Sequence, residues 1–519
     1  MKKTTFLVIA CMLVIATNAQ TWSTSGNAIS SGNFLGTTNN LDFILKRNST
    51  HAGLIGISNT GFGVSSFPIS ASGIDNSAFG TSTLTSITTG NRNSAFGSSA
   101  LQENFTGNDN TAIGASCLTF NRTGSRNTAV GVYAFINGEA GDDNVAIGYS
   151  SMAENYGNSN SALGTYSLSN NFLGYSNVAI GTKSLFSNNY GHNLVAIGDS
   201  ALYHQTTNSY GVYGNTAIGS KALYSNTTGA FNTGNGSEAL LMSTVSDGNS
   251  AFGYQAMKNC TTGYLNTGVG TASNFDITTG YHNIAIGTSA GSYITTGNAN
   301  VCIGDNSFGS SAAFNTIAIG TVAGTAADNQ ARIGNSGMTS IGGYQPWTNV
   351  SDGRIKNNIT HNVPGLLFIN KLSPVTYTLN LEAIDKITQP PQVKYISNNP
   401  SLVEKEKASR NQMEKTVHTG FIAQDVEKAA KSLGYDFSGV DASKNEKDLY
   451  GLRYAIFVVP LVKAVQELSV ENDKKDKTIA DLNTKIDQMQ NQINEILLQL
   501  KKITGSSLVK TTTTETKSL

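Results

Sequence analysis

The chain has 519 residues, of which 54 are glycine, 8 are proline, 39% are hydrophobic and only 13% are charged. It is too long for one compact core, and this composition excludes both a collagen-like chain and a charged, disordered one. The 34 basic residues balance the 34 acidic residues, so the sequence lacks the basic excess of a nucleic-acid-binding protein and we expect no nucleic-acid partner.

Residues 1–19 have the pattern of a secretory signal peptide. Lys2 and Lys3 precede an apolar run, and small residues follow at the position that a signal peptidase requires. The mature chain is therefore expected to begin near Gln20 and to be secreted or displayed at the cell surface. No later stretch approaches the roughly 20 apolar residues that cross a bilayer, so we do not expect the mature protein to span a membrane.

Removal of the signal peptide leaves three cysteines, Cys117, Cys260 and Cys302. An odd number scattered through the chain argues against a disulfide framework. Cys302 occupies a position where comparable segments have alanine, which favours a small buried residue. We predict no metal site and no cofactor.

Residues 20–75 contain the strand-like segment LDFILKR at 41–47 and are predicted to cap the repeat region that begins at residue 76. From 76 to 342 the pattern Asn-x-Ala-(Ile/Phe/Val)-Gly recurs, in most cases every 17 residues, with a longer gap between Gly198 and Gly219. A fixed period of this length is typical of a solenoid in which each repeat forms one coil. The fold class is therefore mostly β, with a repetitive β-roll or β-solenoid fibre.

Within one repeat, residues 93–97 are expected to form a short strand, Ala100 and Leu101 a second strand, and Thr106-Gly107 a turn. The repeated glycine fits a corner that needs a positive φ. Asparagines at equivalent positions of successive coils are expected to hydrogen-bond along the axis.

The central alanine and the following Ile, Val or Phe of each strand point to opposite faces, so both faces are apolar. Burial of the outer face against sister chains is the simplest way to remove it from water. This pattern favours a homo-oligomer, the alternative being a monomeric solenoid with a mildly apolar exterior.

After a junction at 343–350, the composition becomes that of a globular domain. Ser351 and Lys356 lie five residues apart at its start, which suits a serine-lysine dyad in which a neutral amine removes the hydroxyl proton for acyl attack. Spacing alone fits a solvated turn equally well. Further along, residues 383–416, with Pro390, Pro391 and many Lys and Glu, are expected to form an inserted mobile loop.

Residues 461–503 carry apolar side chains at alternating steps of four and three, which predicts a coiled coil. Ile479, Ile486 and Ile493 on one track of the seam, with Ile496 on the other, favour three strands over two. Residues 504–519 are expected to be disordered.

Two resemblances to known families rest on these segments. The repeats NTAIGSKAL at 215–223 and NIAIGTSAG at 283–291 resemble the head of trimeric autotransporter adhesins. This resemblance implies three chains in one β-roll bundle, although the period here is longer than in the shortest family repeats.

The segments SDGRIKNNI at 351–359, INKLSPVTYTLN at 369–380, HTGFIAQDVEKA at 418–429 and YGLRYAIFVVPLVKAVQEL at 450–468 resemble the intramolecular chaperone domain of endosialidase-type phage tailspikes. The resemblance implies that residues 351–460 form an α+β autoprocessing domain. In that family the domain helps a trimeric β fibre to fold and then releases itself by serine-lysine autoproteolysis.

Carried over residue by residue, the family pattern implies that Ser351 is the nucleophile, Lys356 the general base and Asp352 the residue after the cut. The cleavage site would be Ser351-Asp352. The bond before Ser351 remains the chemical alternative, because the hydroxyl reaches the carbonyl of Val350 through a less strained ring.

His418 and Gln424 match family positions near the site, where a structural hydrogen-bonding role is as compatible with the pattern as a catalytic one. Arg354 is expected to position the segment through a carboxylate.

The sequence thus predicts a secreted, adhesin-like homotrimer that is a single-turnover, self-cleaving serine endopeptidase with no external substrate. Its ligand could be extracellular matrix, glycan or another host surface. The alternatives are a prophage tail fibre with the same chaperone and a non-cleaving structural fibre with an oligomerisation domain. The repeats show no carboxylate pair of the kind that cleaves polysaccharides.

Overall fold

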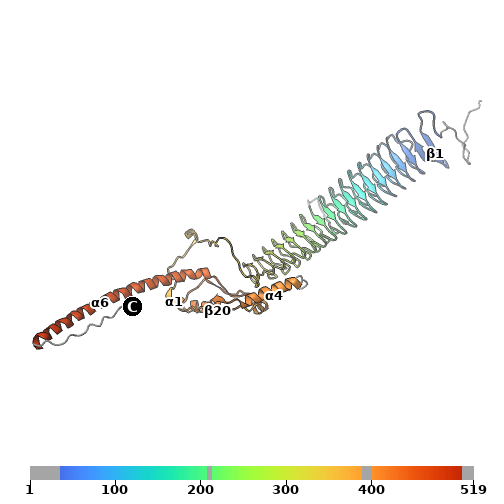
Figure 1. The fold of residues 1–519 in the computed structure, drawn as a ribbon. Helices are drawn as coiled ribbons and strands as arrows, with labels where there is room; N and C mark the ends of the chain where they lie inside the picture. Colours follow the sequence, from blue (N-terminus) through green and yellow to red (C-terminus); the bar gives the residue numbers. More distant parts are fainter. Residues whose placement is uncertain (1–34, 207–212, 346, 389–399, 505–519) are drawn as a thin grey trace, which may run out of the picture. The chain divides into compact units, whose positions relative to one another are not determined.

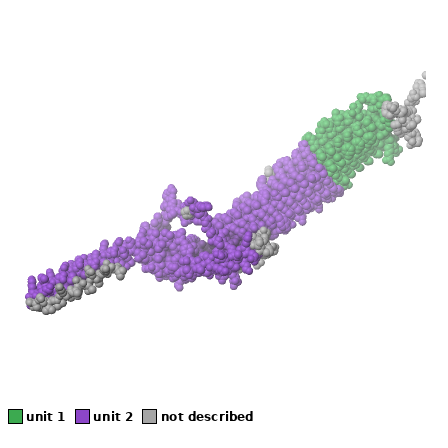
Figure 2. Space-filling model, viewed as in Figure 1, with its two compact units in different colours: residues 1–141 green, residues 142–519 purple. Residues whose placement is uncertain are grey.

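The computed structural model describes residues 35–206, 213–345, 347–388 and 400–504. The chain divides into two compact units, Met1–Gly141 and Asp142–Leu519 (Figure 2). The expected signal peptide lies outside the described residues, as does the expected disordered tail from residue 505 onward.

The first unit begins with antiparallel strands and continues as a parallel stack. Strand β1 (Phe43–Arg47) pairs with β2 (Thr50–Ile55), and β2 pairs with β3 (Thr60–Phe62). Strand β3 then pairs in parallel with β4 (Ser77–Phe79), so parallel pairing begins before residue 76. The stack continues through β5 (Ser94–Phe96), β6 (Thr111–Ile113) and β7 (Thr128–Val130).

The second unit repeats the same three-residue strand in parallel, in-register pairs (Figure 1). The described parts of the chain contain about 16 turns of β-solenoid, which confirms the predicted fold class. The strands of the second unit are β8 (Val145–Ile147), β9 (Ser161–Leu163), β10 (Val178–Ile180), β11 (Val195–Ile197), β12 (Thr216–Ile218), β13 (Thr233–Asn235), β14 (Ser250–Phe252), β15 (Thr267–Val269), β16 (Ile284–Ile286), β17 (Val301–Ile303), β18 (Ile317–Ile319) and β19 (Ala331–Ile333).

Each coil has one strand, and the expected second strand is wrong. Ala100 and Leu101 lie in a hydrogen-bonded turn, where Leu101 has φ 48° and Ser99 has φ 57°. Left-handed φ at a residue other than glycine costs about 1 kcal/mol. The Leu101 side chain is fully buried, and its burial offsets that cost because removing a leucine from water stabilises by about 2 kcal/mol.

The repeated glycine forms the predicted corner, as Gly253 illustrates. Its φ is +136°, and a Cβ there would lie 2.5 Å from the carbonyl oxygen of Gly270 in the next coil. Only glycine accepts both the backbone conformation and the close approach.

Buried asparagines form the predicted ladder along the axis. The Asn249 amide donates to Asn232 Oδ1 over 3.3 Å and to Gly263 O over 2.8 Å, and its own Oδ1 accepts from Asn266 Nδ2 over 3.1 Å. The ladder is interrupted at Leu194, whose buried side chain stands in the asparagine position. Each rung satisfies polar groups that would otherwise be buried without partners.

The two faces of the strands differ sharply in exposure. The central alanines, such as Ala112 and Ala251, are fully buried within their own coils. The residues after them point outward, so Ile113, Phe252 and their equivalents form an exposed or half-exposed apolar ladder. One chain therefore buries the inner apolar side chains of its strands by itself, whereas the outer apolar side chains stay in contact with water.

The three described cysteines are free and buried inside the solenoid. Burial raises the pKa of the Cys117, Cys260 and Cys302 thiols to about 12. They are thus packing residues held in the protonated state.

The C-terminal region of the second unit has a small core of its own. Helix α1 (Leu366–Ile369) contributes Phe368, which packs with Phe437 and with the buried face of helix α5 (Ala423–Lys431). Two short antiparallel pairs lie beside it. They are β20 (Val375–Tyr377) with β21 (His418–Gly420), and β22 (Val440–Asp441) with β23 (Gly451–Leu452).

The expectation of a loop at 383–416 is wrong over most of its described part. Helix α2 (Leu381–Thr388) and helix α4 (Pro400–Lys415) occupy it, while residues 389–399 lie outside the described residues. Lysine and glutamate are good helix formers, and proline suits the first turn of a helix.

Helix α6 (Val458–Thr504) comes directly after the turn η2 (Tyr454–Phe457) and continues for 47 residues. Its first turns contact α1, where Glu467 accepts a hydrogen bond from Leu366 N over 2.7 Å. The seam residues farther along, including Ile479 and Ile486, are more than half exposed. No helix among the described residues is long and apolar enough to cross a membrane.

Candidate functional site

The segment around Ser351 is almost entirely exposed in a single chain. Described residues from 341 to 362 are exposed, apart from the half-buried Asp352. Several of them are large and apolar, with Trp347 85%, Val350 84% and Ile359 68% exposed. Soluble monomers rarely expose several large apolar side chains side by side. The composition of this segment is therefore typical of a surface that packs against another surface.

Asp352 organises the start of the segment. It caps the short helix η1 (Gly353–Ile355) by accepting a hydrogen bond from Arg354 N over 2.9 Å. The Arg354 guanidinium also binds the same carboxylate, with Nη2 2.6 Å from Oδ2. This hydrogen-bonded pair lowers the pKa of Asp352 and raises that of Arg354. Arg354 thus contacts a carboxylate, and its role in positioning the segment stays a prediction.

Ser351 and Lys356 flank this turn and meet across it. Lys356 Nζ lies 2.7 Å from Ser351 Oγ, within hydrogen-bonding distance. The turn from Asp352 to Ile355 is what reverses the chain and brings the two side chains together. Two residues five apart in sequence thus form the hydrogen-bonded pair that a nucleophile and its base require.

The other two candidate residues lie on different elements. His418 begins β21, opposite Tyr377, and the two rings stack with centroids 5.6 Å apart. Its Nε2 is buried without a hydrogen-bond partner in the described part of the chain. Gln424 is exposed in the first turn of α5. Among the described residues, no hydrogen bond joins either side chain to Ser351 or Lys356.

The described residues contain no group of three His, Cys, Asp or Glu side chains arranged to hold a metal ion. The polar groups described at the turn are the Ser351 hydroxyl, the Lys356 amine and the Asp352-Arg354 pair.

Comparison with known families places the turn at the start of a recognised domain. Residues 351–435 match the family model of the chaperone of endosialidase. This chaperone family consists of self-cleaving intramolecular chaperones and implies self-association. The match begins at Ser351 and includes Lys356, Arg354, His418 and Gln424. A search of curated proteins found no match to this chain.

Sequence reasoning missed one site, where the C-terminal region contacts the end of the solenoid. Asp448 accepts a hydrogen bond from Gln330 Nε2 over 2.9 Å, and Asn445 Nδ2 donates to Ala326 O over 2.7 Å. These partners are more than 100 residues apart in sequence. No local pattern signals such a contact.

Proposed function

We propose that this protein is a secreted, trimeric surface fibre whose C-terminal chaperone domain aligns three chains and then cuts itself off at Ser351-Asp352. The observation that carries the proposal is the 2.7 Å contact between Ser351 and Lys356 at the first residue of the chaperone match. The β-solenoid before it and the family match fit a tail-fibre-like protein.

The proposed chemistry begins with a neutral Lys356 amine that removes the Ser351 hydroxyl proton. The oxygen then adds to a carbonyl carbon, the peptide C–N bond breaks, and Lys356 returns the proton to the departing nitrogen. Water hydrolyses the resulting ester. Within one chain, attack on the carbonyl of Ser351 itself closes a strained four-membered ring. Cleavage of the Ser351-Asp352 bond therefore calls for Ser351 of a second chain or for a water molecule that Lys356 deprotonates.

A single chain is not primed for this reaction, which supports a role for assembly. Ser351 and Lys356 are both exposed in a single chain. An amine becomes a base near pH 7 only when burial or a neighbouring cation lowers its pKa. Covering of the exposed segment 341–362 by sister chains supplies the burial that one chain lacks.

Two exposed apolar surfaces support three chains in the assembly. One surface is the ladder of outward-pointing apolar residues on the solenoid strands, and the other is the apolar seam of α6. Both are exposed in one chain. Alignment of three solenoids is a slow, non-local step, and a coiled coil that raises local concentration accelerates it. Removal of the chaperone after assembly would trap the fibre kinetically.

Secretion rests on the sequence pattern of residues 1–19, and an adhesive role rests on the resemblance of the repeats to adhesin heads. A prophage tail fibre remains the second candidate because the chaperone match and the solenoid suit it equally. Detection of the fibre outside intact, unlysed cells would favour the secreted fibre.

The dyad is tested with Lys356→Arg, which preserves the positive charge and a hydrogen-bond donor but cannot be deprotonated at accessible pH. We expect this variant to remain full-length on a denaturing gel while still assembling. The matched control is Lys371→Arg at another exposed lysine of the same domain, which should be cut like the parent. Cutting of Lys356→Arg at the parental rate would exclude Lys356 as the base.

A further inference from the structure

The last strand of the solenoid departs from all the described strands before it in the parallel stack. Strand β19 pairs in register with β18, and Arg332 stands opposite Ala318. From β3 to β18, the corresponding residue is alanine, glycine or cysteine and lies inside the coil. A long cation therefore stands at the position that is interior in the earlier coils, and its side chain is 42% exposed there.

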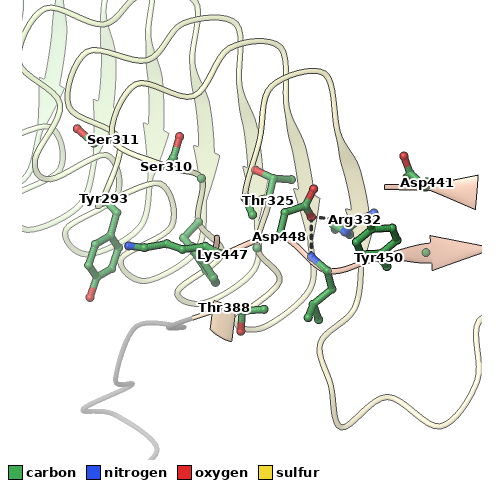
Figure 3. A pocket seen from close by; sticks show the side chains of 16 residues that line it. Tyr293, Ser310, Ser311, Thr325, Arg332, Thr388, Asp441, Lys447, Asp448 and Tyr450 are labelled. Atoms are coloured by element: carbon green, nitrogen blue, oxygen red, sulfur yellow. Dashed lines mark hydrogen bonds and ion pairs between the residues drawn. The ribbon is translucent and has the colours of Figure 1, made fainter. Parts of the chain in front are cut away.

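The C-terminal region contacts this position. Asp448, whose side chain is only 4% exposed, lies 3.5 Å from Arg332 Nη2 (Figure 3). It accepts a 2.9 Å hydrogen bond from Gln330 Nε2. Asp448 also binds the backbone of its own loop, at Lys444 N over 3.0 Å and Leu449 N over 3.1 Å. The carboxylate thus fastens the loop 444–449 to the end of the solenoid.

Gln330 links this contact to completion of the last coil. Its Oε1 accepts hydrogen bonds from Ala326 N and Ala327 N, and its backbone carbonyl accepts one from Ile317 N in β18. The amide that reaches Asp448 is consequently in place only when the final coil has formed. Asn445, which donates to Ala326 O over 2.7 Å, binds the same turn.

The interface also contains a space that no described side chain fills. A cavity of about 550 Å³ lies between the loop and the last coils, lined by Tyr293, Phe308 and Thr325 on the solenoid and by Tyr450 on the C-terminal region (Figure 3). Side chains around such a gap lack partners for dispersion contacts. The contact therefore rests mainly on a few charge-assisted and amide hydrogen bonds.

We propose that the end of the solenoid, at Gln330 and Arg332, is a binding site for loop 444–449 of this chain, and that it retains the C-terminal fragment noncovalently after the backbone is cut. The occupant is the loop itself, which caps the open end of the fibre. Cutting and release are then separate events, and the fragment leaves only when the contacts of Asp448 and Asn445, together with the bonds of Ser409 and Arg410 to Gly337 O and Ser336, break. The retention step rests on the proposed self-cleavage, but the binding site does not.

The experiment makes the cut independent of the dyad. A recognition site for a sequence-specific protease is inserted between Gly342 and Gly343, both exposed, in a full chain that carries Ser351→Ala and an N-terminal affinity tag. After protease cleavage, the C-terminal fragment recovered with the tagged solenoid is quantified. We expect most of it to be retained.

Substitutions on both sides of the contact give the decisive comparison. Asp448→Ala should lower the retained fragment about tenfold, the loss expected for a buried charge-assisted hydrogen bond. Because Asp448 also holds its own loop together, Arg332→Ala is the second variant. It introduces the residue that most earlier strands carry and should have the same effect. Asp436→Ala, at an exposed acid of the same domain, should match the parent.

Release of the fragment from the chain with Asp448 and Arg332 intact would overturn the proposal, as would full retention in both variants. A chain with Ser351 intact that fails to cut itself would contradict the proposed function alone, since the added protease makes the cut in this experiment.

Discussion

Lys356 Nζ lies 2.7 Å from Ser351 Oγ, and both side chains are exposed in a single chain. In the proposed reaction Lys356 accepts the serine proton as a neutral amine, and burial is what favours the neutral form of an amine. One chain thus shows the contact between the two side chains but not their burial. Burial of the turn is the missing step, and sister chains are its source in our proposal.

Disruption of the α6 seam should abolish assembly and cutting together. Ile486→Lys places a charge in the apolar seam, which a coiled coil does not tolerate. We expect light scattering to report monomers and a denaturing gel to show the uncut chain. Gln488→Lys adds the same charge off the seam and should leave both properties unchanged. Efficient cutting of monomeric Ile486→Lys would separate cleavage from assembly.

The glycine corner should be intolerant of a single added methyl group. Gly253→Ala forces a left-handed φ on alanine and places its Cβ 2.5 Å from Gly270 O. We expect the free energy of unfolding to fall by about 2 kcal/mol or more, since both strain and backbone displacement contribute. Gly342→Ala, where nothing lies within 4 Å of the added Cβ, serves as the control in denaturant titrations. Equal stability of the two variants would contradict the proposed reason for the repeated glycine.

Loss of one rung should weaken the asparagine ladder. Asn249→Ala removes the acceptor of Asn266 and the donor to Gly263 O. The stranded buried groups should cost about 1–3 kcal/mol of unfolding free energy. Asn259→Ala removes a half-buried amide that bonds only Asp276 Oδ1 over 3.3 Å among the described contacts, and should cost clearly less. A reversed order would mean that the ladder does not stabilise the coil.

The buried thiols give a dependence of stability on pH with a definite sign. The pKa of Cys302 is raised to about 12 by burial, whereas an unfolded cysteine ionises near pH 8.5. As the pH rises, the unfolded state loses its proton first, so the stability that the buried thiol contributes is complete below pH 8.5 and is lost between there and pH 12.

Cys302→Ala, which restores the residue of the neighbouring strand β18, removes this titration. Between pH 7 and pH 10, the parent should therefore lose about 2 kcal/mol more unfolding free energy than the variant. Parallel curves for the two proteins would show that the thiol ionises equally in both states.

The sequence revealed those features that repeat or that lie close together along the chain. The period of the glycines predicted the solenoid because each coil needs a corner at the same place, and the recurrent asparagines predicted the ladder for the same reason. The turn at Leu101 was missed because leucine rarely adopts a left-handed φ, and only burial within the coil makes it favourable there. Proximity in sequence also placed Ser351 beside Lys356, because a short capped turn suffices to join them.

Other features depended on contacts that no local pattern records. Asp448 meets Gln330 across 118 residues, and an isolated aspartate in a polar loop gives no sign of its partner. Helix α4 was predicted as part of a loop because the segment 383–416 was judged by its composition. Within the helix, however, the one proline, Pro400, is the first residue, and the Lys and Glu residues favour helix.

The measurement that tests the central claim most directly is the intact mass of the purified protein lacking residues 1–19, beside its Ser351→Ala variant. We expect a C-terminal fragment that begins at Asp352 in the parent and only the full-length chain in the variant. A fragment that begins at Ser351 would move the cut to the bond after Val350. A parent that assembles into trimers yet stays uncut would contradict self-cleavage and leave a domain that only assembles the fibre.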